Sequence, residues 1–198
     1  MNYQILKKNF EAHRFHTVYF KTKEEAAGYL KDTLTGEAIG FGGSMTAKEM
    51  KLDEVLGEKN EIFWHWLTSD DETRKKAAAA SVYILSANGV AETGELVNID
   101  GTGNRLSASL YGPKKVIYLI GNNKIAPDLT EAVKRARQVA CTKNAARFGI
   151  KTPCVANPDN GCVDCNSPAR ICNALLILER PCNGMEVELL FIDEELGF

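Results

Sequence analysis

Residues 81–125 concentrate amide, carboxylate and guanidinium side chains between two apolar runs. The runs, Val82–Leu85 and Val116–Ile120, are short and bounded by turn residues, so they predict buried strands. The polar residues and glycines of interest between them are Asn88, Glu92, Thr93, Asn98, Asp100, Gly101, Asn104 and Arg105. Open α/β sheets bind ligands beyond the carboxyl ends of their strands, where glycine lets the backbone approach closely. The stretch therefore predicts one wall of a small-molecule site; the alternative is a solvated loop.

A glycine-rich turn predicts the second wall. Ala38–Phe41 is an expected strand, and Gly42-Gly43-Ser44 follows it directly. Thr46 precedes Glu49 by three residues, a capping-box spacing that predicts a helix opening at Thr46. Free N–H groups at such a helix start suit a phosphate or carboxylate. A structural role for Glu49, as the capping-box partner of Thr46, is at least as good an interpretation as a role in binding or chemistry. The turn is neither a P-loop nor a full G-x-G-x-x-G motif, so no nucleotide cofactor is predicted.

Two cationic side chains complete the predicted site. Arg105 can hold a carboxylate with two parallel hydrogen bonds, which suits a small organic acid. Lys124 follows Gly121-Asn122-Asn123, just after the second apolar run. It could neutralise an anionic substrate, or act as a base if its pKa is depressed; the alternative is a solvated lysine.

A cluster of cysteines predicts a metal site. Cys154, Cys162, Cys165 and Cys172 fall within nineteen residues with the spacing C-x7-C-x2-C-x6-C. A C-x-x-C turn directs two thiolates to one point, and two flanking cysteines complete a set of four. Zinc and an iron–sulfur cluster both take four thiolates, so the metal stays undecided, and free thiols or a disulfide are the alternatives. The two remaining cysteines, Cys141 and Cys182, are expected to be ordinary residues.

The elements that must position these residues alternate between strand and helix through residue 148, which predicts an open, mostly parallel α/β sheet flanked by helices. An aromatic strand is expected at Glu61–Leu67, a helix at Arg105–Tyr111 and the longest helix at Asp128–Phe148. After a cysteine-rich loop at 151–172, an antiparallel hairpin is expected within 173–198, from Ala174–Glu179 and Val187–Ile192 around Cys182-Asn183-Gly184.

Bulk properties exclude several classes of protein. The 198 residues fit one domain, 1–198, and the 44% hydrophobic and 25% charged contents are ordinary for a globular chain. A net charge of −2 gives no electrostatic footprint for nucleic acid or a membrane surface. With neither a membrane span nor a signal-peptide core in the sequence, a cytoplasmic protein is expected. The sequence leaves open whether the chain forms a homodimer.

Long motifs resemble the LUD domain family, named for lactate utilisation. They are GFGGSMTAKEM, SANGVAETGELVNIDGTGNR, YGPKKVIYLIGNNKIAPDLTEAVKR, AARFGIKTPC and CVDCNSPARICNALLILER, and they cover nearly the whole chain. The resemblance implies a NagB/RpiA/CoA-transferase-like fold and a role in bacterial oxidation of L-lactate to pyruvate, alongside iron–sulfur partner proteins. It brings no settled catalytic mechanism.

A more distant resemblance concerns two of these segments. IGFGGSMT is similar to the phosphate loop of ribose-5-phosphate isomerases, and SANGVAETGELVNIDGT to a motif of methylthioribose-phosphate isomerase. The second similarity puts Asn88 where those isomerases hold a catalytic aspartate. An amide cannot take up a proton at neutral pH, so Glu92 is the carboxylate left as a candidate acid/base.

These observations predict a small anionic metabolite at the strand ends and a subunit of a lactate-oxidising system. Glu92 and Lys124 are the candidate catalytic residues. The alternatives are a non-catalytic metabolite-binding or assembly subunit with a structural metal, and a sugar-phosphate isomerase-like or transferase-like enzyme.

Overall fold

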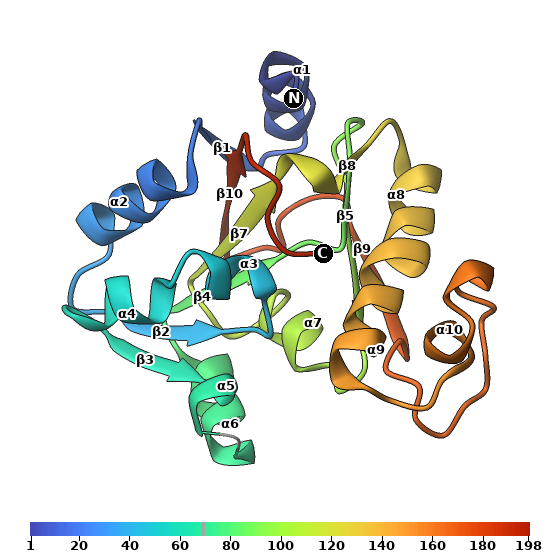
Figure 1. Ribbon diagram of the computed structural model, residues 1–198. Helices are drawn as coiled ribbons and strands as arrows, with labels where there is room; N and C mark the ends of the chain where they lie inside the picture. The colour runs from blue at the N-terminus through green and yellow to red at the C-terminus, as the bar shows by residue number, and fades with distance from the viewer. Residues whose placement is uncertain (69) are drawn as a thin grey trace.

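The computed structural model describes residues 1–68 and 70–198. Its larger sheet is entirely parallel, with the order β1-β10-β7-β4-β2-β3 (Figure 1). In that order the strands are His16–Phe20, Glu186–Ile192, Lys115–Gly121, Val82–Ser86, Ala38–Phe41 and Glu61–Trp64. The predicted open parallel α/β sheet is confirmed.

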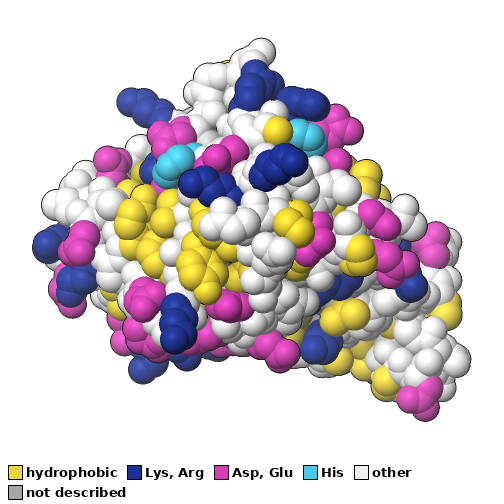
Figure 2. Space-filling view, turned by 90° about the horizontal axis from the view of Figure 1, so that it is seen from above, with side chains coloured by type: hydrophobic (Ala, Val, Ile, Leu, Met, Phe, Trp, Pro, Cys, Tyr) yellow, Lys and Arg dark blue, Asp and Glu magenta, His cyan; other side chains and the backbone are white. Residues whose placement is uncertain are grey.

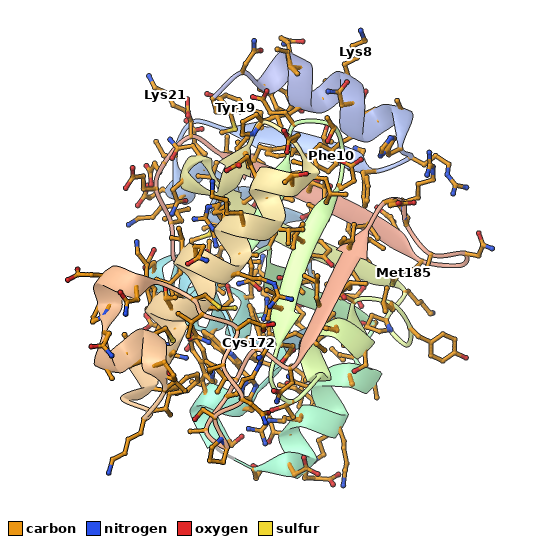
Figure 3. The ribbon with its side chains drawn as sticks, turned by 90° about the vertical axis from the view of Figure 1, so that its right-hand side faces the viewer. Lys8, Phe10, Tyr19, Lys21, Cys172 and Met185 are labelled. Atoms are coloured by element: carbon orange, nitrogen blue, oxygen red, sulfur yellow. The ribbon has the colours of Figure 1, made fainter. Side chains whose placement is uncertain are left out.

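Helices cover both faces of this sheet because its strands are apolar on both sides. On one face, α2 (Lys23–Thr33), α3 (Met45–Glu49) and α4 (Leu52–Gly57) pack their apolar side chains on the sheet. On the other face, α1 (Tyr3–Ala12), α6 (Asp71–Ala79) and α7 (Asn104–Ala108) contribute to the second core. Phe10 of α1, labelled in Figure 3, is fully buried in that core.

A smaller sheet forms a further layer, in the order β8-β5-β6-β9. Its strands are β8 (Ile125–Ala126), β5 (Gly89–Ala91), β6 (Leu96–Asp100) and β9 (Ala174–Leu178). Alternate side chains point to opposite faces of a strand, so Val90 and Leu96 join the core of the large sheet while Ala91 and Val97 face the long helix. The small sheet is therefore held between the large sheet and that helix (Figure 1).

The long helix confirms the expectation for residues 128–148, with one irregularity. It runs as α8 (Leu129–Arg135), a π-helical segment η2 (Ala136–Cys141) and α9 (Thr142–Phe148). Asp128 caps its start by accepting a hydrogen bond from the Glu131 N–H, and Gly149 ends it at a φ of 63°. The π segment was not foreseen, and such segments are frequent at functional sites.

The predicted C-terminal hairpin is wrong. β9 pairs antiparallel with β6 in the small sheet, whereas β10 lies parallel between β1 and β7 in the centre of the large sheet. Residues 182–184 therefore connect two sheets. Both segments are strands, as predicted, but their partners are distant in sequence. β9 lies about 70–80 residues after β6, and β10 lies about 70 residues after β7 and about 170 after β1, beyond any local pattern.

Three predicted boundaries also shift. β3 ends at Trp64, and a short helix, α5 (His65–Thr68), takes the place of the rest of the predicted strand. Ser44, and not Thr46, caps α3 by accepting a hydrogen bond from the Ala47 N–H at 3.1 Å. The helix expected at Arg105–Tyr111 is the shorter α7. The remaining short elements are η1 (Asn122–Lys124), α10 (Pro153–Ala156) and η3 (Pro158–Asn160).

The outer surface is mixed in charge on the face seen in Figure 2, where basic and acidic side chains alternate around a hydrophobic area. That face carries no broad basic surface. Within the described residues, every helix is too short or too polar to cross a membrane.

The close packing of α6 on β2 yields a stability prediction. A Cβ at Gly40 would overlap the backbone carbonyl of Ala77, whereas Gly28, inside α2, has open space around it. Gly40→Ala should lower the free energy of unfolding by about 2–3 kcal/mol. Gly28→Ala, the matched control, should raise it by about 0.5–1 kcal/mol because alanine favours helix. Urea unfolding measures both; a neutral Gly40→Ala variant would contradict this packing.

Candidate functional site

A cleft opens where the carboxyl ends of β2, β3, β4 and β7 meet, as expected for an open α/β sheet. Its volume is about 220 Å³, and the long helix and the small sheet close its other side. The polar residues that line it are Ser44, His65, Arg74, Ser86, Asn88, Asp100, Thr102, Asn104, Arg105, Lys124, Asn144 and Arg147. The two predicted walls, the Gly43-Ser44 turn and the 81–125 stretch, do come together here.

Lys124 occupies the floor of the cleft and is 2% exposed. Its Nζ donates hydrogen bonds to Thr46 Oγ1 at 3.0 Å and to Ser86 Oγ at 2.7 Å. The hydrogens of those hydroxyls are committed elsewhere, because Thr46 donates to the Leu196 carbonyl and Ser86 to the Leu119 carbonyl. Both hydroxyls therefore accept from the lysine.

Burial lowers the pKa of Lys124 to about 7, and the positive charges of Arg135 and Arg105 act in the same direction. At neutral pH a large share of the amine is thus uncharged. A neutral amine has two N–H groups, which the two hydroxyls accept, and one lone pair that they leave free. Lys124 is the one lysine among the described residues that lines the cleft, and it can take up a proton there.

Arg105 is fixed by the protein more than the sequence suggested. Its Nη1 donates to the Ile99 carbonyl at 3.1 Å, and its Nη2 donates to the Ser86 carbonyl at 3.1 Å and to Asn98 Oδ1 at 2.8 Å. Among the described residues, no acceptor meets its buried Nε. Arg105 therefore supplies a rigid positive charge at the cleft, with the Nε–H and one Nη1–H left over.

Several predicted binding residues are hydrogen-bonded to one another or to the backbone within the wall of the cleft. Asn98 is 1% exposed and does not line the cleft; its Oδ1 also accepts the Asn88 N–H at 3.1 Å. Asn88 lines the cleft, and its Oδ1 accepts the Ile99 N–H at 2.8 Å. Asp100 accepts the N–H groups of Thr102 and Arg105 at 3.1 and 3.0 Å, so its carboxylate orders the loop before α7. This network holds the wall in one conformation.

Of the remaining predicted residues, some line the cleft and others support it. Gly43, Ser44, Gly101 and Asn104 line the cleft. Gly42 lies behind the lining, where a Cβ would crowd the Arg105 side chain. Thr46 supports Lys124, and Glu49 accepts a hydrogen bond from the Gly197 N–H at 2.8 Å, which ties α3 to the C-terminal segment.

Glu92 and Thr93 lie elsewhere. They occupy the turn between β5 and β6, next to α1, where Asn9 donates a hydrogen bond to the Glu92 carbonyl. Thr93 Oγ1 donates to the neighbouring Glu95 carboxylate. Neither residue lines the cleft. Glu92 follows β5, a strand that the sequence did not predict, and β5 belongs to the small sheet.

A second basic wall was not foreseen. Arg74 from α6 and Arg147 from α9 line the cleft, as do His65 and Trp66 after β3. The Arg147 guanidinium lies 4.8 Å from the Trp66 ring centroid, and Trp66 in turn stacks on Trp64. Arg147 stands in the last turn of its helix, where basic residues are common for helix stability alone, so the sequence offered no distinguishing signal.

The charge of the lining is strongly positive. Among the described residues, Arg74, Arg105 and Arg147 form no salt bridge with a carboxylate, and Asp100 is the one acidic residue of the lining. Burial, followed by the charge of Arg74, lowers the pKa of His65 and so disfavours a positive charge on its ring. An anionic ligand would compensate this excess of positive charge.

The four predicted metal ligands line a different, smaller cavity beside the cleft. Cys154, Cys162, Cys165 and Cys172 all face it, together with Cys141 from the end of the π segment. The cysteines are free thiols. In the described part of the chain, no three His, Cys, Asp or Glu side chains are positioned to hold a metal ion directly.

Comparisons with known proteins bear on the family and the fold. A family model described as LUD domain matches residues 3–190. The fold is similar to the crystal structure of a duf162 family protein from Deinococcus radiodurans, with a TM-score of 0.57 and 11% identity, covering 96% of this chain and 95% of that chain. At this identity the likeness concerns the fold alone. No curated protein matches the chain.

The buried amine yields a pH prediction. In the window from about pH 7 to 10.5, folded Lys124 is neutral while the unfolded chain still binds the proton, so stability rises with pH. Lys124→Met removes this contribution. The free energy of unfolding of the wild type, relative to Lys124→Met, should therefore increase across that window in urea titrations at several pH values. Lys134→Met, at an exposed lysine, is the control. Parallel profiles for Lys124→Met and the wild type would contradict the assignment.

Proposed function

Because the chain belongs to the LUD domain family, we propose that it binds a small 2-hydroxy or 2-oxo carboxylate, of the L-lactate and pyruvate class, in the cleft at the strand ends. It acts there as a component of a lactate-oxidising system. The observation that carries the proposal is the cluster of arginines without carboxylate partners, among the described residues, around the buried Lys124.

The proposal divides the binding roles between two walls. Arg147, held on the Trp66 ring, and Arg74 reach the cleft from α9 and α6 and suit the ligand carboxylate. Arg105 is engaged by backbone carbonyls and contributes mainly its charge. The cleft volume of about 220 Å³ suits a molecule of a few non-hydrogen atoms with some water.

Lys124 suits the chemistry at the ligand's C2 oxygen. Oxidation of L-lactate to pyruvate removes two protons and two electrons. A neutral lysine amine can accept the hydroxyl proton, and its ammonium form can hydrogen-bond the new carbonyl oxygen. The C2 hydrogen would leave with the electron pair, as a hydride, to a two-electron acceptor such as a flavin on a partner protein, and iron–sulfur partner proteins would take the electrons on singly. Glu92 has no part in this proposal because it does not line the cleft.

Calorimetric titration with L-lactate and pyruvate tests the binding. Arg74→Gln and Arg147→Gln should each weaken the affinity by about tenfold or more, because each removes a charge-assisted hydrogen bond. Arg180→Gln, at an exposed arginine outside the cleft, is the matched control and should bind like the wild type.

The alternatives give different results in the same experiment. If neither carboxylate binds, or if both cleft variants bind as tightly as the wild type, the proposal fails. If ribose 5-phosphate binds in their place, the isomerase-like alternative is favoured.

Lys124→Met separates a catalytic role from a binding role. It should keep carboxylate binding within a few-fold but lower lactate oxidation, measured with partner proteins or an artificial electron acceptor, by about 100-fold or more. A wild-type protein that binds the carboxylates without turnover, in an assay that oxidises lactate with a known dehydrogenase as positive control, would favour the non-catalytic metabolite-binding subunit.

A further inference from the structure

Lys124 is a buried amine without a carboxylate partner. It is 2% exposed, and among the described residues it forms no salt bridge. The nearby carboxylate of Glu49 accepts the Gly197 N–H at 2.8 Å instead. A buried ammonium normally needs a paired carboxylate, because taking a charge out of water is costly. The surroundings of Lys124 therefore suit the uncharged amine.

The arginines around Lys124 act in the same direction. Arg135 donates hydrogen bonds to the carbonyls of Asn123 and Asn88, so its guanidinium is fixed beside the floor of the cleft. Burial first, and then the charges of Arg135 and Arg105, lower the pKa of Lys124 to about 7, while Glu49 acts in the opposite direction. A neutral amine is the form that attacks a carbonyl carbon.

The hydrogen bonds of the amine leave its lone pair available. Thr46 Oγ1 and Ser86 Oγ accept its two N–H groups at 3.0 and 2.7 Å. The hydrogens of those hydroxyls are donated to backbone carbonyls, so neither hydroxyl donates to the lysine nitrogen. Since Lys124 lines the cleft, a ligand held there can meet this lone pair.

A 2-oxo acid brings its carbonyl carbon to the same place. Its ketone carbon is bonded directly to its carboxylate, and Arg74 and Arg147, which suit that carboxylate, line the same cleft as Lys124. The cleft volume of about 220 Å³ keeps a molecule of this size close to the amine. Holding two reacting groups together in this way favours the reaction between them.

We propose that Lys124 forms an imine with the C2 carbon of a 2-oxo carboxylate in the cleft, so that the protein holds this class of ligand covalently. This proposal rests on the binding role proposed above. The nitrogen lone pair forms a bond to C2, the carbonyl π bond breaks toward oxygen, and that oxygen leaves as water with the two amine protons. The step needs no oxidant or reductant. L-Lactate has no carbonyl at C2 and cannot react in this way.

Borohydride reduction of the full chain tests the proposal, because hydride converts an imine into a stable secondary amine. After incubation with pyruvate and borohydride, mass spectrometry should find one carboxyethyl group on the peptide that carries Lys124, and none after incubation with L-lactate. Lys134, an exposed lysine of α8, is the internal control. Absence of the adduct at Lys124, or equal modification of Lys124 and Lys134, overturns the proposal.

The result separates this proposal from the binding proposal. Pyruvate that binds in the calorimetric titration but gives no adduct removes the imine and leaves the carboxylate site in place. If pyruvate gives neither binding nor an adduct, both proposals fail.

Variants distinguish a held ligand from random modification. Lys124→Met should lose the adduct while its circular dichroism stays unchanged; mapping the adduct on the wild type decides the site even if this variant does not fold. Arg147→Gln keeps the amine, and it should lower labelling by about tenfold at pyruvate concentrations below saturation, because the carboxylate is held less tightly. Arg180→Gln, at an exposed arginine outside the cleft, is the matched control. Labelling of Arg147→Gln at the wild-type level contradicts the proposal.

Discussion

The hydrogen bonds of the buried Lys124 amine join the parts of the chain on which the cleft depends. Its Nζ connects α3 through Thr46 with β4 through Ser86, and the Thr46 hydroxyl continues to the Leu196 carbonyl beyond β10. A buried ammonium is costly unless it is hydrogen-bonded, and burial accordingly lowers its pKa to about 7. The packing that fixes the ends of these strands also buries the amine, which can therefore exchange a proton near neutral pH.

The arginines of the basic walls have two different roles: Arg105 supports the structure of the wall, and Arg147 is open to a ligand. Arg105 donates hydrogen bonds from its terminal nitrogens to the carbonyls of Ile99 and Ser86, so it stabilises the wall formed by residues 81–125. The Arg147 guanidinium lies over the Trp66 ring and donates two hydrogen bonds to Asn144 Oδ1. These contacts fix its position, although it has no carboxylate partner among the described residues. Positive charge held in this way favours anions.

The part of the site that could be predicted was the part encoded by strand ends. Gly43, Asn88 and Lys124 follow β2, β4 and β7, which are strands of the large sheet, so they line the cleft as expected. The prediction for Glu92 failed because its strand pairs in the small sheet. Asn98 is buried behind the lining, and Asp100 lines the cleft but uses its carboxylate to hold the loop before α7. Arg74 and Arg147 were missed because a basic residue on a helix has the same local pattern whether it meets solvent or a ligand.

The sequence by itself determined the local elements, since alternation of apolar residues, capping side chains such as Asp128 and stop signals such as Gly149 act over a few residues. Its long motifs also determined the family. Only the tertiary structure decided that β9 and β10 separate into two sheets, and that Cys141 joins the loop cysteines at one cavity. Strand pairing and side-chain convergence depend on contacts between distant residues, which compete globally for the same buried surface, and no local spacing records the outcome.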